Sequence, residues 1–248
     1  MPAITFTLFR LPARRAPAAF AEMGRAPPVL RTVPGARSLR LMGTGRGRGL
    51  DVWPDFRSYV LLGTFEDVEA ARSFLDASPW MASYRRGVEE ELTLWLEPVG
   101  GGGRWDGEEP FEVVAPGLDA AEPVAVLTRA TVRGTAMPAF WRAASAVNRE
   151  LARLEPPLSI GFGELPWVRQ ATFSLWPSRD AMEAFAYRSV AHRRAMIEAR
   201  KHRWFAEDLF VRFRVLRSEG SWRGANPLPD LGEPPASGAS RDVRGRRS

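Results

Sequence analysis

The chain contains no cysteine and has only two histidines, His192 and His202, and one lysine, Lys201. The absence of cysteine excludes disulfides, thiolate-ligated haem, iron–sulfur clusters and cysteine-based zinc sites. No stretch reaches the roughly 20 apolar residues of a membrane-spanning helix, and the first residues lack the apolar core of a signal peptide. These absences predict a cytoplasmic protein with a short inventory of catalytic side chains.

Common catalytic and nucleotide-binding motifs are also missing. No G-x-S-x-G hydrolase motif occurs. The glycine run GTGRGRG at 43–49 does not match the dinucleotide-binding pattern, because Arg48 stands where a glycine is needed, and it lacks the GK[ST] ending of a Walker A loop. We interpret the run as a turn whose backbone passes close to another part of the protein, with a phosphate site as the alternative.

Positive charge is concentrated in the first part of the chain. The net charge is +6, and residues 1–50 contain nine arginines but a single acidic residue, Glu22. Such a basic patch attracts nucleic acid, anionic lipid or an acidic protein. No nucleic-acid recognition motif is present and the aromatic residues do not alternate with the arginines, so we do not expect a nucleic-acid partner. A solvated basic face is the simpler alternative.

The order of predicted elements repeats once along the chain. The first set has strands at 4–9, 38–42, 59–63 and 92–97, with helices near 17–23 and from Asp67. The second has strands at 124–131, 158–163, 169–176 and 209–216, with helices at 138–154 and 179–201. Each set has the β-α-β-β-α-β order of a ferredoxin-like unit. The closing segments also match, GRWDG at 103–107 with GSWRG at 220–224, and an alignment places Phe74 on Phe185.

We therefore predict an α+β fold of tandem ferredoxin-like units, arranged within one chain like a dimeric α+β barrel. The predicted domains are residues 1–107 and 123–224. A linker at 108–122 joins them. The tail at 225–248 is rich in proline, glycine and serine and is expected to be disordered.

His192 is the residue most suited to chemistry. The helix predicted at 179–201 carries a stripe spaced by threes and fours that faces the interior, namely Met182, Phe185, Ser189, His192 and Met196. An inward neutral imidazole suits a metal or haem ligand. A buried histidine satisfied by backbone groups is the alternative. His202 stands among charged residues near the helix end and is expected to be exposed.

Several segments together resemble the spheroidene monooxygenase family of carotenoid ketolases. The segments are LMGTGRGRG (41–49), PVAVLTRATVR (123–133), AFWRAASAV (139–147), IGFGELPWVRQATFSLWPS (160–178), AMEAFAYRSVAHRRAMI (181–197), KHRWFAEDLFVRFRVL (201–216) and GSWRGANPL (220–228). They stand in the family's order over most of residues 38–228. The first 35 residues and the tail carry the least likeness.

The resemblance implies an oxygen-consuming oxidoreductase with haem b that takes electrons from a ferredoxin-type donor. The family converts the C-2 methylene of an acyclic carotenoid to a ketone by two hydroxylations, after which the geminal diol loses water. His192, in the AHRRA segment, matches the family's histidine and is implied to be the axial ligand of the iron. The choice between His192 and His202 stays open. A different apolar secondary metabolite is an alternative substrate.

The remaining site residues are expected from their positions along the chain. Arg169 and Gln170 precede a buried strand and are candidates for oxygen activation or for binding a haem propionate, the alternative being a solvent-facing strand start. The aromatic side chains expected to line an apolar pocket are Phe140, Trp141, Trp176 and Phe185, the alternative being ordinary core.

The resemblance also gives the basic patch a role. It would hold the protein at the inner face of the cytoplasmic membrane, where a carotenoid resides, or receive an acidic ferredoxin. A haem-using dehydratase or peroxidase-like enzyme on the same scaffold is one alternative function, and a non-catalytic haem or apolar-ligand binder is another. A homodimer is compatible with either.

Overall fold

Two units of the same topology follow one another along the chain. The computed structural model describes residues 1–113, 117–154, 156–165 and 167–231. The first unit consists of β1 (Ala3–Arg10), α1 (Ala16–Leu30), β2 (Ala36–Gly45), β3 (Pro54–Phe65), α2 (Val68–Arg72), α3 (Pro79–Arg85) and β4 (Glu90–Gly103). The second consists of β5 (Val124–Val132), α4 (Met137–Leu154), β6 (Leu158–Leu165), β7 (Arg169–Trp176), α5 (Arg179–Arg188), α6 (Val190–Lys201) and β8 (Phe205–Gly220). Short turns η1 (Ala13–Arg15), η2 (Ser73–Ala77) and η3 (Gly134–Ala136) adjoin the helices.

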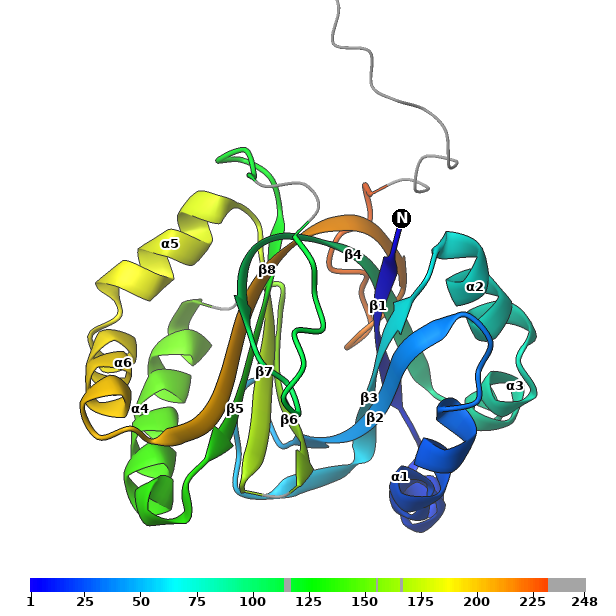
Figure 1. Cartoon of the computed structure of the whole chain (residues 1–248), viewed down its shortest axis with the longest axis horizontal. Coiled ribbons are helices and arrows are strands. Elements are labelled where there is room, and N and C mark those ends of the chain that lie inside the picture. Colours follow the sequence, from blue (N-terminus) through cyan, green and yellow to red (C-terminus); the bar gives the residue numbers. More distant parts are fainter. Residues whose placement is uncertain (114–116, 155, 166, 232–248) are drawn as a thin grey trace, which may run out of the picture.

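All eight strands form one closed antiparallel barrel. The strand order is β1-β3-β2-β6-β7-β5-β8-β4, and β4 returns to pair with β1. Each unit contributes four neighbouring strands, and the units meet where β2 pairs with β6 and β4 with β8. Helices α1–α3 lie outside the first sheet and α4–α6 outside the second, on opposite sides of the barrel (Figure 1). The predicted tandem of ferredoxin-like units in a barrel-like arrangement is therefore confirmed.

Apolar side chains from all eight strands fill the interior of the barrel. Inward positions alternate along each strand, as Ile4, Phe6 and Leu8 do in β1. Across the interior, Phe6 stacks on Phe173 with 3.9 Å between ring centroids. Such packing makes the interior a solid core, so space for a ligand has to be sought outside the barrel, beneath the helices.

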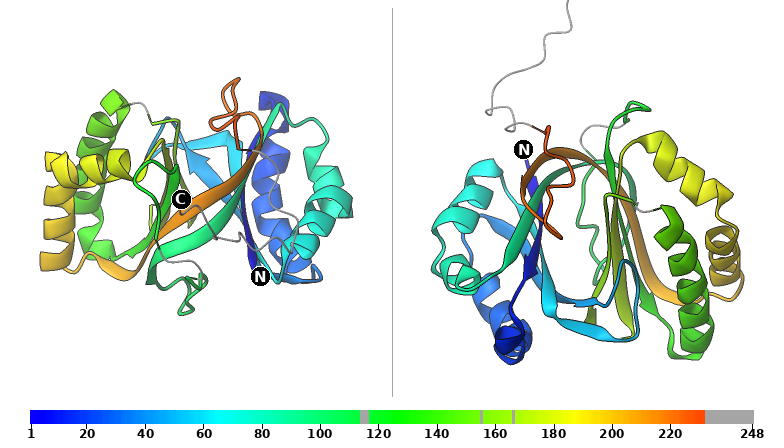
Figure 2. Two further views of the ribbon diagram at one scale, coloured as in Figure 1. Left: turned by 90° about the horizontal axis from the view of Figure 1, so that it is seen from above. Right: turned by 180° about the vertical axis from the view of Figure 1, so that it is seen from behind.

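The two segments that matched in sequence form equivalent turns at the barrel ends. Trp105 and Trp222 are both buried in the barrel core. The N–H groups of Asp106 and Gly107 donate to the Glu207 carboxylate, and those of Arg223 and Gly224 donate to Glu90 in the same way. Because β4 and β8 are antiparallel, the two turns lie at opposite ends of this strand pair. Figure 2 shows the two halves of the chain from above and from behind.

The last predicted helix is in fact two helices. Ser189 has an extended backbone, with φ −66° and ψ 114°, and this ends α5. Its hydroxyl accepts a hydrogen bond from the N–H of His192 and so caps α6. Met196, predicted on the inward stripe, is 44% exposed on the outer side of α6. An extended serine that caps the next helix breaks the 3.6-residue periodicity on which the prediction of one helix rested.

The last strand is longer than expected, and part of the tail is ordered. β8 spans Phe205–Gly220 because it pairs with both β4 and β5. Residues 232–248 of the predicted disordered tail lie outside the described residues, whereas Leu228 and Leu231 pack against the barrel core. The domain boundaries expected at 107 and 123 stay predictions. None of the helices in the described ranges is long and apolar enough to cross a membrane.

An ion cluster centred on the buried Arg129 closes one end of the barrel around Trp105. The Arg129 side chain is 2% exposed, pairs with Glu207 and lies 3.6 Å from both Asp106 and Glu164. Its guanidinium also lies over the Trp105 ring, 5.3 Å from the centroid. Burial acts to raise the pKa of Asp106, but the hydrogen bond and charge of Arg40 outweigh it and hold that pKa below its usual value.

Removal of the buried arginine is expected to destabilise the fold strongly. Arg129→Met leaves carboxylates at the barrel end without their buried partner, which costs about 3–5 kcal/mol. The matched control is Arg169→Met, because Arg169 contacts the same acids but is 42% exposed, so its loss should cost about 1 kcal/mol or less. Urea unfolding followed by circular dichroism measures both, and equal losses would contradict the assigned role of burial.

Candidate functional site

The helix-facing side of the first sheet is covered, whereas that of the second is open. In the first unit, Phe9, Leu61 and Trp95 face α1–α3 and are buried. In the second unit, Thr128 is exposed although Val126 and Ala130 on either side of it are buried. Its neighbour across the β5–β8 ladder, Phe210, is 45% exposed. Helices α4–α6 pack mainly on one another and leave the middle of their sheet uncovered.

The helices of the two units correspond residue by residue. Ser78 caps α3 by accepting from the N–H of Met81, and Ser189 caps α6 by accepting from the N–H of His192. The same spacing along the chain separates Phe74 from Phe185, as the sequence alignment predicted. His192 therefore occupies the position that a fully buried methionine, Met81, occupies in the first unit.

Small residues replace the aromatic filling in the second unit. In the first unit Phe74, Trp80 and Tyr84 stack in a column whose last ring meets Phe9. The same separation along the chain that relates Ser78 to Ser189 relates Trp80 to Ala191 and Tyr84 to Ala195. The registers of the strand ladders show that Ala130 is the counterpart of Phe9. Phe9 pairs with Tyr59 in the first unit, and Ala130 pairs with Gln170 at the equivalent place in the second. Loss of several large rings at equivalent positions explains why the second unit is hollow.

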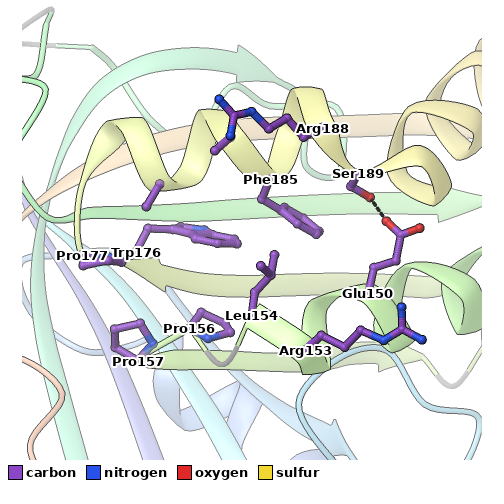
Figure 3. Close-up of a pocket in the computed structure, with 12 residues that line it drawn as sticks. Glu150, Arg153, Leu154, Pro156, Pro157, Trp176, Pro177, Phe185, Arg188 and Ser189 are labelled. Carbon is purple, nitrogen blue, oxygen red and sulfur yellow. Dashed lines mark hydrogen bonds between the residues drawn. The ribbon is translucent and has the colours of Figure 1, made fainter.

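A cavity of about 520 Å³ lies between the helices and the end of the second sheet. It is lined by Glu150, Arg153, Leu154, Pro156, Pro157, Trp176, Pro177, Ala181, Ala184, Phe185, Arg188 and Ser189. Trp176 and Phe185 stack with 5.1 Å between centroids, and Figure 3 shows them between the prolines on one side and the Glu150–Ser189 pair on the other. The volume and the apolar lining suit a small organic ligand or cofactor.

His192 lies beside this cavity, behind Phe185. The two rings are 5.4 Å apart between centroids, and Nδ1 of His192 is buried with no hydrogen-bond partner among the described residues. Burial lowers the pKa of His192, while the Ala186 backbone and the charge of Glu150 act in the opposite direction. The imidazole is therefore held neutral, with a nitrogen available to a ligand or metal.

Glu150 fixes the start of α6 and so the position of His192. Its carboxylate accepts from the Ser189 hydroxyl and from the N–H of Ala191 at 3.1 Å. The Ser189 hydrogen bond lowers the pKa of Glu150, with burial acting against it. The carboxylate on α4 thus clamps the break between α5 and α6. The sequence analysis did not predict the contact with Glu150. The match between Ser78 and Ser189 could have indicated that a helix begins at Ser189.

The structure separates the predicted site residues. Trp176 and Phe185 line the cavity, and His192 adjoins it. Phe140 and Trp141 lie in a separate apolar cluster with Ala199 and Trp204, and do not line the cavity. His202 is exposed at the end of α6, 3.3 Å from Glu198.

Arg169 and Gln170 lie at the far end of β7 from the cavity. About 20 Å of strand separates Gln170 from Trp176, at roughly 3.3 Å per residue. Gln170 is buried and donates to the Leu165 carbonyl at 3.3 Å, on the helix-facing side of the strand. Arg169 belongs to the ion cluster, 3.1 Å from Asp106. The structure thus brings Gln170, but not Arg169, to the side of the sheet that the helices face.

The glycine-rich run of the first unit forms a side wall of the second. Gly49 lies against Gly161 of β6 and against the Asn148 side chain of α4, and the Gly49 backbone leaves no room for a side chain at Gly161. The Asn148 amide donates to the Leu50 carbonyl, and Trp167 donates to the Val52 carbonyl at 3.1 Å. The predicted close backbone approach is confirmed, and it seals the gap between α4 and β6.

Replacement of His192 by methionine should stabilise the protein without ligand. His192→Met copies the first unit and removes a buried polar atom that lacks a partner, which should add about 1–3 kcal/mol to the free energy of unfolding in urea. The reciprocal control, Met81→His, should destabilise the fold because it places an imidazole in a filled core. A large loss of stability in His192→Met would contradict this assignment.

The same variant should flatten the pH dependence of stability. The fold lowers the pKa of His192, so the unfolded chain binds the extra proton first as the pH falls. Stability that is present above about pH 6.5, the unperturbed histidine pKa, is therefore lost below it. Melting temperatures measured between pH 7.5 and 5 should fall less in His192→Met than in the wild type. Parallel curves would show that His192 does not titrate in this way.

Comparison with known proteins first supports the fold. No protein-family model matches the chain. Two solved structures of aldoxime dehydratase, one of them in complex with butyraldoxime, superimpose with TM-scores of 0.56 and 0.55 at 10% identity. Both matches cover 86% of this chain, and they cover 81% and 79% of the dehydratase chains. At this identity the likeness shows a shared fold.

Three curated proteins named spheroidene monooxygenase match at higher identity. Those from Cereibacter sphaeroides, Rhodobacter capsulatus and Rubrivivax gelatinosus are 36%, 34% and 39% identical over 79%, 92% and 77% of this chain. The chain covers 61% of the first relative's length, 96% of the second's and 73% of the third's. The chain therefore belongs to the spheroidene monooxygenase family of oxidoreductases.

Proposed function

We propose that this chain is a haem b-dependent, oxygen-consuming monooxygenase that acts on an acyclic carotenoid. The observation that carries the proposal is the open helix-facing side of the second unit, where the neutral His192, with Nδ1 buried and unpaired, lies beside an apolar cavity. The names of the curated relatives supply the reaction class and the carotenoid. The finer reaction, oxidation of the C-2 methylene to a ketone by two hydroxylations, follows from the family resemblance.

The residues present fit a haem. In the described part of the chain no three carboxylate or imidazole side chains gather to hold a bare metal ion, whereas a haem iron needs a single protein ligand on one side. His192 would supply that ligand, and Trp176 and Phe185 would pack against the ring. Bound haem would supply the oxygen-activating iron centre, while the protein supplies orientation and exclusion of water.

The chain's own residues then have distinct roles. The clamp between Glu150 and Ser189 orients His192 through the first turn of α6. The wall formed by the glycine-rich run keeps water away from the gap between α4 and β6. For Gln170 and Arg169 a role in oxygen activation stays a prediction, because Gln170 lies at the far end of β7 from the cavity and the ion cluster holds the Arg169 side chain.

The electron donor and the membrane contact belong to the same proposal. A ferredoxin-type donor is acidic in the expected pairing, so the arginines of residues 1–50 would receive it. The same arginines would hold a cytoplasmic protein at the inner face of an anionic membrane, from which an apolar carotenoid is taken up.

Haem binding and its ligand are tested by the absorption spectrum. Protein purified from cells supplied with a haem precursor should show a Soret band, which His192→Ala should lose. His202→Ala is the matched control and should keep the band, because His202 is exposed and away from the cavity. Loss of the band in His202→Ala alone would move the ligand to the end of α6, and a wild type without haem would refute the cofactor.

Turnover tests the reaction class. With a carotenoid, a ferredoxin system and oxygen, the loaded wild type should consume oxygen and reductant in step with ketone formation. Turnover of a substrate without either would instead favour a dehydratase or peroxidase-like enzyme. Saturable ligand binding without any product would favour a binding protein.

A further inference from the structure

The outer face of α5 and α6 exposes large apolar side chains to solvent. The two helices form the outer edge of the second unit (Figure 1, Figure 2). On them Tyr187, Val190 and Ile197 are 71%, 65% and 64% exposed, and Met196 is 44% exposed. At about 100° per residue, Val190 and Ile197 lie roughly 140–160° around α6 from His192. They therefore face away from the candidate site, and they add nothing to the core.

Cations without a carboxylate partner surround these apolar side chains. The exposed cations of the two helices are Arg188, Arg193, Arg194, Arg200 and Lys201. Within the described residues none of the five forms an ion pair, because Glu183 is paired with Arg179 and Glu198 with His202. On α6 the cations stand on both sides of the exposed apolar residues. Apolar side chains flanked by arginine and lysine are typical of a helix that lies on a membrane surface.

The charge and the apolar groups together decide which partner fits this face. Two copies of the chain packed face to face about a two-fold axis would bring the same cations against one another. A transient encounter with an acidic redox protein would match the charge but bury little apolar surface. A bilayer with anionic lipids matches both features, since the cations meet the head groups and the apolar side chains reach the acyl chains beneath them.

We propose that the outer face of α5 and α6 is the surface through which this protein binds an anionic lipid bilayer. The inference rests on the proposed function, in which the carotenoid is taken from a membrane. It places the bilayer contact on the second unit and leaves the arginines of residues 1–50 to the electron donor. The cavity opens beside this face, because Leu154 and Arg188 line it and are both exposed. An apolar molecule can then pass from the lipid to the cavity without crossing water.

Co-sedimentation of the whole chain with lipid vesicles tests this surface. The wild type should bind phosphatidylcholine vesicles that contain phosphatidylglycerol more tightly than vesicles of phosphatidylcholine alone. Arg193→Gln/Arg194→Gln should weaken binding to the anionic vesicles about 30-fold, since two cations near the charged surface are lost. Val190→Ser/Ile197→Ser should weaken it about 10-fold, since less apolar surface is buried in the lipid.

The matched controls change exposed residues of the same kinds in the first unit, whose helices lie on the opposite side of the barrel. They are Phe20→Ser/Val29→Ser for the apolar pair and Arg14→Gln/Arg25→Gln for the cations. Both controls should bind anionic vesicles like the wild type. Thermal unfolding should show that all five proteins are folded.

Vesicle binding that is unchanged in either α6 variant, or reduced equally by its control, would overturn the inference. A folded wild type that binds no vesicles would do the same. So would a dimer that Val190→Ser/Ile197→Ser dissociates in analytical ultracentrifugation, or a wild type that binds an acidic ferredoxin through Arg193 and Arg194 but no vesicles. The Soret band, and turnover of a carotenoid supplied in detergent, test the proposed function separately and stand or fall independently of these results.

Discussion

Closure of the barrel is the constraint on which the rest of the structure depends. Pairing of β2 with β6 and of β4 with β8 satisfies the edge strands of both units and encloses one apolar core. Because that core is filled, the helices are confined to the outside and a ligand has to lie between a helix layer and its sheet. The ion cluster around Arg129 and the turns of Trp105 and Trp222 complete the closure at the barrel ends.

Within this frame, the two units provide an internal comparison. They share caps, turns and strand order, yet one has Trp80, Tyr84 and Phe9 between helix and sheet while the other has alanines. The first unit is stabilised by burying those rings. The second forgoes that stabilisation and leaves the middle of its sheet uncovered, and it places a histidine with an unpaired Nδ1 where the first has Met81. A site that lowers stability locally is typical of a position kept for function.

The family likeness, the cavity and the neutral His192 all concern the second unit. The likeness to aldoxime dehydratase structures concerns the fold, whereas the likeness to spheroidene monooxygenases extends through the sequence around His192. Glu150 connects the two halves of the site, because it clamps the break before α6 on one side and lines the cavity on the other. The glycine-rich run then links the units, since a loop of the first closes the second.

The sequence by itself determined the repeated element order and the fold class, and it singled out His192, Trp176 and Phe185, which the structure places at or beside the cavity, because these depend on local periodicity and on residue type. Only the tertiary structure decided that the helix breaks at Ser189, that Glu150 holds the break, and that Phe140 and Trp141 pack away from the cavity. It also placed Arg169 in an ion cluster with residues distant in the chain. Hydrogen bonds and packing between segments far apart in sequence leave no periodic signal, so the cavity could be found only after both layers were in place.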